Sequence, residues 1–132
     1  MTVFVDTSGL YAVLDAGDAH HSRAARAWRD LLDDGHPLVT HDFVLVETTA
    51  LLQRRAPLRV VAALHQAILP AMEIMSVDAA LRYAAVTALL AARRSGVSLV
   101  DWTSFTLMRR HGIETAFAFD DDFADGGFRL IP

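Results

Sequence analysis

The chain begins with the stretch TVFVDTSGL, residues 2–10, and the interpretation of the rest depends on it. Its first residues are apolar and partly β-branched, which is typical of a buried strand, and Asp6 follows them directly. The apolar spacing after Thr7 predicts a helix over 8–16. Because ligands bind beyond the carboxyl ends of strands in open α/β sheets, we expect Asp6 to lie at a functional edge.

Length and composition limit the class of protein. The 132 residues suffice for one domain with a substantial core, which we assign to 1–132, and 53% of them are hydrophobic, which argues against disorder. No apolar run approaches the roughly 18 residues of a membrane span, and no secretory signal is found, so we expect no membrane contact and a cytoplasmic location. The chain has no cysteine, which excludes disulfides, thiol catalysis and Cys-ligated zinc.

The charges exclude several kinds of phosphate site. The formal net charge is −4, and all 12 basic residues are arginine. Without lysine, the chain cannot contain a P-loop or a Schiff-base lysine. A mildly acidic chain does not coat nucleic acid through bulk charge, so any action on nucleic acid requires a local site.

Strand and helix patterns alternate along the whole chain. This alternation favours an α/β sandwich of three layers, in which a mostly parallel sheet of four or five strands has helices on both faces. Asp42 is the expected N-cap of one helix, and Gly96 the expected stop of another. The predicted strands are 2–5, 37–40, 72–76, 115–119 and 128–131, and the predicted helices are 8–16, 20–34, 42–55, 57–69, 78 to the stretch 93–96, and 98–112, with a turn over 120–127.

The positions of three acidic residues can be explained by a structural role as well as by a functional one. Asp6 suits the N-cap of the helix that follows it. Asp101 ends the stretch SLVD, which begins at Ser98 and has the spacing of a capping box; since a helix N-terminus stabilises an ionised carboxylate, a cap can also be a metal ligand. Glu47 lies on or beside the apolar stripe of its helix without a basic neighbour one turn away, so it needs an arginine from another helix or a cation.

A run of three aspartates follows the alternating stretch AFAF at 116–119. If the alternation continues, Asp120 and Asp122 share one side and Asp121 lies opposite. A solvated acidic turn would explain the run, yet two adjacent carboxylates repel each other unless a cation lies between them.

Strand ends and the following helix starts share one edge of a parallel sheet, so these acidic residues are expected to converge there. Oxygen ligands without cysteine suit Mg²⁺ or Mn²⁺ rather than structural zinc. The six histidines include no H-x-x-x-H pair and therefore do not predict a zinc site.

Four segments, in this order, resemble the motifs of PIN domains. They are VFVDTS at 3–8, VLVET at 44–48, SLVD at 98–101, and FDDDF at 119–123 with Gly127 and Phe128 after it. Their order and the chain length are similar to the single-domain PIN toxins of bacterial type II toxin–antitoxin modules, the VapC family, over essentially the whole chain. One departure is Ala118, where members often carry Thr or Ser, and it puts in doubt a hydroxyl contact from that side.

The resemblance implies a PIN-like fold and an endoribonuclease that depends on Mg²⁺ or Mn²⁺. Carried over position by position, Asp6, Glu47, Asp101 and Asp120 would be the catalytic acidic quartet. Asp6, Asp101 and Asp120 would hold the ion, with Asp122 as a further ligand that only some members possess, while Glu47 would orient or deprotonate the water or hold a second ion. The resemblance also implies an RNA substrate, a cognate antitoxin and a homodimer.

Two other interpretations stay open. A haloacid-dehalogenase-like phosphatase also begins with an aspartate at a strand end, but it needs a second Asp where this chain has Ser8, and a lysine, which the chain lacks. A PIN scaffold that binds RNA or protein without catalysis would have lost an acidic position, and none is missing. Paired arginines such as Arg54 and Arg55 are candidates for RNA contact, although surface charge at a helix end explains them as well.

Overall fold

The computed structural model describes residues 1–93 and 95–132. Its centre is a five-stranded sheet in which every neighbouring pair is parallel, with the strand order β3-β2-β1-β4-β5. The predicted parallel α/β architecture is therefore confirmed. The strands are β1 Val3–Val5, β2 Leu38–His41, β3 Glu73–Met75, β4 Thr115–Phe117 and β5 Arg129–Ile131.

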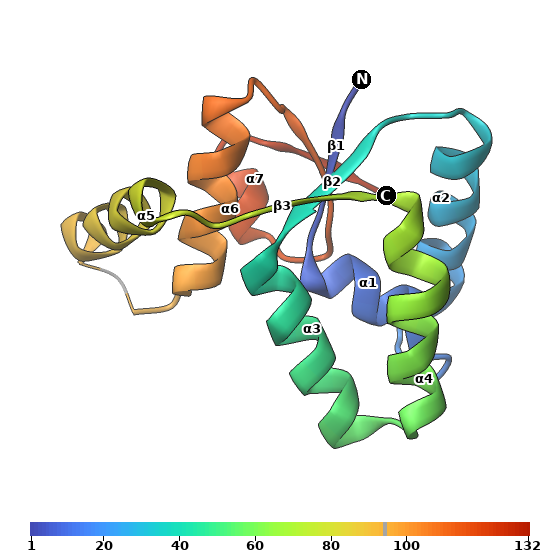
Figure 1. The fold of residues 1–132 in the computed structure, drawn as a ribbon. Coiled ribbons are helices and arrows are strands. Elements are labelled where there is room, and N and C mark those ends of the chain that lie inside the picture. Colours follow the sequence, from blue (N-terminus) through green and yellow to red (C-terminus); the bar gives the residue numbers. More distant parts are fainter. Residues whose placement is uncertain (94) are drawn as a thin grey trace.

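Helices cover both faces of the sheet. Figure 1 shows α1, α2 and α4 on one side of the strands and α5, α6 and α7 on the other, and α3 contacts members of both groups. None of the helices in the described residues is long and apolar enough to cross a bilayer. The helices are α1 Thr7–Leu14, α2 His21–Asp33, α3 Asp42–Arg55, α4 Leu58–Ala63, α5 Ala79–Ala92, α6 Leu99–Arg110 and α7 Asp122–Asp125, with a π-helical turn η1 Leu64–Ile68 and a 3₁₀ turn η2 Leu69–Ala71.

Strand β1 forms the middle of the core. All three of its residues are completely buried, because the strand has neighbours on both edges and helices on both faces. Phe4 stacks on Phe123 of α7 with ring centroids 6.1 Å apart, and Phe117 of β4 contacts Trp28 of α2 at 5.7 Å. The apolar stretch at the start of the sequence is thus a central strand, and it leads directly to Asp6.

The strand order creates a switch point between β1 and β4. From β1 the chain passes through β2 to β3 at one edge, then crosses to β4 and ends at β5 on the opposite edge. In open α/β sheets a crevice opens at such a point, beyond the carboxyl ends of the strands. Asp6 follows β1 and Asp120 follows β4, so both residues reach this crevice.

Helix α1 packs against β4 without space for a side chain at Gly9. A Cβ placed there would lie 2.4 Å from Cδ1 of Phe117 and 2.6 Å from its carbonyl oxygen. Only glycine allows α1 to begin directly after Asp6 while it lies this close to the neighbouring strand. No local sequence pattern predicted this contact.

Two predicted elements are wrong in detail. The helix predicted over 57–69 consists of α4 followed by η1 and η2, because Pro70 has no N–H to continue an α-helical hydrogen-bond pattern. The turn predicted over 120–127 contains the short helix α7.

Two predicted helix ends also differ. His41, and not Asp42, caps α3, while the Asp42 carboxylate accepts a hydrogen bond from the Val77 N–H at 3.1 Å. Arg93, and not Gly96, takes the left-handed conformation that ends α5, with φ of 52°. Arg94, which belongs to the same predicted end, lies outside the described residues.

Candidate active site

The predicted acidic residues meet in one cleft at the carboxyl ends of β1 and β4. The cleft has a volume of about 440 Å³, and Asp6, Glu47, Asp101 and Asp120 all line it. They come from the end of β1, from α3, from the first turn of α6 and from the loop after β4. The structure therefore brings together all four members of the predicted quartet.

Asp101, Asp120 and Asp122 form the tightest acidic group in the described part of the chain. Each offers a carboxylate oxygen, and these oxygens lie within 4.8 Å of one another. Carboxylates at this separation repel one another unless they are protonated or share a cation. Since hard cations prefer oxygen ligands, the group could bind a metal ion.

Asp120 and Asp122 approach each other for a reason that the sequence pattern did not predict. Strand β4 ends at Phe117, so strand alternation does not extend to the acidic run. Instead, Oδ1 of Asp120 accepts a hydrogen bond from the Asp122 N–H at 2.9 Å, an Asx turn that begins α7. Asp120 and Asp122 therefore lie close together as predicted, but a turn and not strand alternation brings them together.

Ser8 holds Asp6 in position. The Asp6 carboxylate is only 3% exposed and accepts hydrogen bonds from the Ser8 N–H at 3.1 Å and the Ser8 hydroxyl at 2.6 Å, so it caps α1 as expected. The Ser8 hydroxyl oxygen also accepts a hydrogen bond from the Phe119 N–H at 2.9 Å. One hydroxyl thus joins the end of β1 to the residue that precedes Asp120, a connection between distant residues that local patterns cannot reveal.

Asp101 lies at the start of α6, in the position that the capping motif predicted. The Ser98 hydroxyl accepts a hydrogen bond from the Asp101 N–H at 3.1 Å, and Asp101 itself is 9% exposed. The cap and the cleft position are therefore compatible.

Burial raises the pKa values of two cleft carboxyls. The pKa of Asp6 rises from 3.8 to about 6, mainly through burial, with smaller increases from Asp120 and Glu47, while hydrogen bonds from Ser8 oppose the rise. Burial also raises the pKa of Asp101 to about 7, and the charges of Asp6, Asp120 and Glu47 add to the effect. A cation in the cleft would favour the ionised forms that burial disfavours.

His41 aligns α3, which carries Glu47, with α6, which carries Asp101. Its Nδ1 accepts hydrogen bonds from the N–H groups of Phe43 and Val44, and its Nε2–H donates to the Ser104 hydroxyl at 2.8 Å. Burial lowers the pKa of His41 to about 4, which keeps the imidazole neutral. Sequence reasoning missed this residue; its place directly before a helix was the only available signal.

Arginine partners do not explain the cleft carboxylates. Among residues 1–93 and 95–132, neither Asp6, Glu47, Asp101 nor Asp120 forms an ion pair with an arginine. Glu47 is half-buried rather than fully buried, so its charge retains some contact with solvent. The alternative of a cross-helix arginine for Glu47 thus finds no support in the described residues.

Aromatic and basic side chains form two walls of the cleft. On one wall the His20 ring is stacked on Phe119, with centroids 4.5 Å apart and an interplanar angle of 12°. The Arg23 guanidinium, which does not itself line the cleft, lies 5.8 Å from the Phe119 centroid. On the other wall the Arg55 guanidinium lies 5.9 Å from the Tyr11 ring centroid. These side chains offer flat surfaces and positive charge beside the acidic floor.

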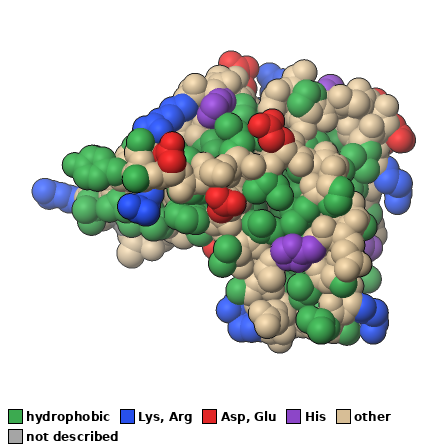
Figure 2. All heavy atoms as spheres, in the orientation of Figure 1, with side chains coloured by type: hydrophobic (Ala, Val, Ile, Leu, Met, Phe, Trp, Pro, Cys, Tyr) green, Lys and Arg blue, Asp and Glu red, His purple; other side chains and the backbone are tan. Residues whose placement is uncertain are grey.

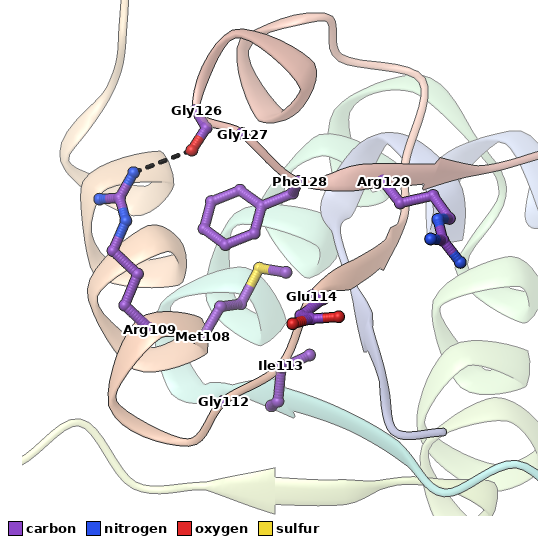
Figure 3. A pocket seen from close by; sticks show the side chains of 9 residues that line it. All are labelled: Met108, Arg109, Gly112, Ile113, Glu114, Gly126, Gly127, Phe128 and Arg129. Carbon is purple, nitrogen blue, oxygen red and sulfur yellow. Dashed lines mark hydrogen bonds between the residues drawn. The ribbon is translucent and has the colours of Figure 1, made fainter.

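A larger cavity, of about 630 Å³, lies at the other end of the strands, near the amino ends of β4 and β5. Figure 3 shows Arg109 along one side of it, where its guanidinium donates a hydrogen bond to the Gly126 carbonyl at 3.0 Å and lies 5.3 Å from the Phe128 ring centroid. None of the acidic quartet lines this cavity. The smaller cleft is therefore the better candidate for chemistry.

Comparisons with known proteins show which family and which fold this chain resembles. The PIN domain family model matches residues 3–128. The chain is 41% identical over 128 residues to the 23S rRNA-specific endonuclease VapC20 of Mycobacterium tuberculosis, covering 96% of this chain and 95% of the relative. The crystal structure of Mycobacterium tuberculosis VapC20, a Sarcin-Ricin loop cleaving toxin, is similar with a TM-score of 0.87 and 37% identity, covering 98% of this chain and 99% of that chain. FitAcB from Neisseria gonorrhoeae, at 18% identity, a TM-score of 0.68 and coverage of 100% and 97%, shows similarity of fold alone.

Proposed function

The chain belongs to the PIN-domain family as an endoribonuclease of the VapC toxin type, and we propose that it hydrolyses RNA phosphodiester bonds in the acidic cleft. The observation that supports this site is the group formed by Asp101, Asp120 and Asp122, whose oxygens lie within 4.8 Å of one another. Two of its members, Asp101 and Asp120, line the cleft together with Asp6 and Glu47. PIN-domain nucleases are metal-dependent, and this acidic cluster could bind the metal.

Asp6, Asp101, Asp120 and Asp122 would hold Mg²⁺, with Mn²⁺ as the alternative ion. A donor set made only of carboxylate oxygens fits a hard divalent cation. When bound, such an ion supplies Lewis acidity, which lowers the pKa of the attacking water and offsets the charge of the phosphate. The hydrogen bonds from Ser8 orient Asp6 for this role.

Glu47 would act on the attacking water. Its half-buried side chain lines the cleft and forms no hydrogen bond or ion pair within the described residues, so the carboxylate is available to accept a proton. As the water attacks phosphorus, the bond to the 3′ oxygen breaks and that oxygen takes a proton from solvent. The products are a 5′-phosphate and a 3′-hydroxyl.

Arg55 would bind a phosphate beside the scissile bond. It lies in the last turn of α3, lines the cleft, and forms no ion pair with a carboxylate among residues 1–93 and 95–132. A guanidinium suits the recognition of phosphate oxygens, and it offsets part of the negative charge that repels RNA from this cleft.

The substrate we propose is a loop of large-subunit ribosomal RNA. The Mycobacterium tuberculosis relative is named as specific for 23S rRNA, and its crystal structure is titled as that of a toxin cleaving the Sarcin-Ricin loop. Identity of 41% over nearly the whole of both chains supports a shared substrate. Because ribosomes are the target, we place the reaction in the cytoplasm.

Two protein partners accompany this function, a cognate antitoxin that covers the acidic cleft and a second copy of the chain. The surface offers apolar contacts for them: Tyr83 and Leu90 on α5 are 76% and 71% exposed, and Figure 2 shows hydrophobic side chains gathered over α5 at the left of the view. We expect light scattering after size exclusion to give the mass of a dimer. A monomer at micromolar concentration would contradict this part of the proposal.

Cleavage of isolated 23S rRNA and of a hairpin copy of the loop, followed by mapping of the new 5′ ends, tests the function. We expect one main cut in the presence of Mg²⁺ or Mn²⁺ and none with EDTA. Asp120→Asn should reduce the rate at least about 100-fold, since Asn retains the turn to Asp122 but loses the charge. Asp121→Asn, at the exposed neighbouring position, should cut like the parent. Parental cleavage by a folded Asp120→Asn protein would refute the site.

A further inference from the structure

We propose that His20 is the exposed end of a stacking platform that binds an unpaired RNA base next to the scissile phosphate. The platform consists of the rings of His20 and Phe119, which line the same cleft as the acidic quartet. This inference rests on the proposed function, because it concerns how that cleft holds its RNA.

The geometry leaves one face of the imidazole open. The two rings are nearly parallel, at 12°, with centroids 4.5 Å apart, so one face of His20 covers Phe119. His20 is exposed whereas Phe119 is half-buried. The solvent-exposed part of the His20 ring is therefore its other face and its edges. A further flat ring can stack on that face.

Backbone hydrogen bonds hold both rings at a defined place relative to the acidic floor. The Phe119 N–H donates to the Ser8 hydroxyl, which itself donates to Asp6, at 2.9 and 2.6 Å. The His20 N–H donates to the Asp18 carboxylate at 2.8 Å, just before α2 begins. A base on the platform would thus place its own phosphate near the carboxylates, which is the role of a positioning residue.

The chemistry of the cleft favours a nucleic acid base as the occupant. The chain carries a formal charge of −4 and the cleft floor is acidic, so bulk attraction to phosphates is weak here. Stacking of bases on aromatic rings provides affinity that does not depend on net charge, and unpaired loop bases are free to stack. The Arg23 guanidinium, 5.8 Å from the Phe119 centroid, adds positive charge beside the platform.

A fluorescent base tests the contact directly. A hairpin copy of the ribosomal loop carries 2-aminopurine at one loop position at a time, and it is bound to Asp101→Asn protein so that it is not cut. We expect quenching of 2-aminopurine at one position beside the scissile bond. Adding His20→Phe should retain the quenching, whereas adding His20→Ala should abolish it and weaken binding about tenfold. His111→Ala, which removes an exposed histidine at the opposite edge of the sheet, is the matched control.

Cleavage kinetics in the otherwise unchanged protein provide the second measurement. His20→Ala should raise KM for the hairpin about tenfold with little change in kcat, and His20→Phe should restore KM. Parental KM and quenching in His20→Ala would overturn the platform. So would a His20→Phe protein as defective as His20→Ala, since the imidazole proton would then matter more than the ring.

Three further outcomes separate this inference from the proposed function. Loss of antitoxin binding in His20→Ala with RNA binding intact assigns the surface to a protein partner and overturns the platform. A parent protein that neither binds nor cuts the hairpin refutes the ribosomal substrate itself. Parental cutting that is unaffected by His20→Ala refutes the platform alone.

Discussion

Two carboxylates of the cleft, those of Asp6 and Asp101, are buried. Burial raises the pKa of Asp6 to about 6 and that of Asp101 to about 7, so their ionised forms destabilise the fold until a cation binds. The same two residues lie at helix starts, Asp6 as the cap of α1 and Asp101 in the first turn of α6. Each of these two residues therefore has a structural role at a helix start and also lines the candidate active site.

Asp101→Asn should stabilise the metal-free protein at high pH. The folded-state pKa of Asp101, about 7, lies above the ordinary 3.8, so the folded protein binds the proton more tightly and stability falls as pH rises through this window. Asn cannot ionise and avoids the loss. Urea unfolding in EDTA should show the variant more stable by about 4 kcal/mol near pH 8, with the difference shrinking toward about pH 4.

His41 gives the opposite dependence of stability on pH, and its contribution has to be separated from that of Asp101. Its folded-state pKa of about 4 lies below the ordinary 6.5, so the unfolded chain binds the proton first and stability falls as pH drops through this window. Because His41 is present in both proteins, its contribution disappears from their difference. A difference between parent and Asp101→Asn that does not change with pH would contradict the burial of an ionisable Asp101.

Among the elements, helix starts decide where the acidic groups lie. Asp6 precedes α1, Asp101 lies in the first turn of α6, and Asp122 is the first residue of α7. Each sheet connection therefore brings a helix start to the carboxyl ends of the strands. The close packing of α1 on β4 is what brings Asp6 to the same place as the residues after β4.

Gly9→Ala should disturb this packing strongly. The added Cβ would meet Phe117 atoms at 2.4 and 2.6 Å, one of them a backbone oxygen that cannot move aside. We expect a loss of about 3 kcal/mol in the free energy of unfolding, measured by urea titration. Gly96→Ala is the control, because nothing lies within 4 Å of its added Cβ and it should change stability little. Equal stabilities of the two variants would show that α1 can shift away from β4.

Arg55→Ala tests the last turn of α3 as a phosphate contact. Both Arg54 and Arg55 are exposed in that turn, but only Arg55 lines the cleft. Arg55→Ala should raise KM for RNA about tenfold and reduce the dependence of binding on salt, without lowering the melting temperature. Arg54→Ala should remain within about twofold of the parent. Similar effects of both substitutions would indicate that only bulk charge matters.

At the scale of the whole molecule, the fold brings negative groups together, and a cation relieves the repulsion. At about pH 8, saturating Mg²⁺ or Mn²⁺ should stabilise the protein by about 3 kcal/mol at a concentration near 100 times Kd, which raises Tm by about 5–10 °C. The effect should be smaller near pH 5, where Asp6 and Asp101 hold their protons. Asp120→Asn should lose most of the shift and Asp121→Asn should keep it in a thermal scan. A Tm insensitive to both ions would argue against a metal in this cleft.

The sequence alone determined the alternation of strands and helices, the parallel sheet, and the candidate acidic residues. These features follow from patterns a few residues long: the apolar run before Asp6, the S-x-x-D spacing that ends at Asp101, and the apolar helical neighbours of Glu47. The absence of lysine and cysteine excluded other chemistries in the same direct way. Hydrophobic periodicity and helix-capping motifs depend only on residues close together in the sequence, so they can be recognised without knowledge of the fold.

Only the tertiary structure decided which of these groups meet and what holds them. The hydrogen bond from Phe119 to Ser8, that from His41 to Ser104, and the contact of Gly9 with Phe117 all join residues far apart in the chain. Such contacts depend on strand order and on how closely helices approach the sheet, and no local period encodes either. The turn that joins Asp120 to Asp122 forms beyond the end of β4 at Phe117, where strand alternation no longer applies.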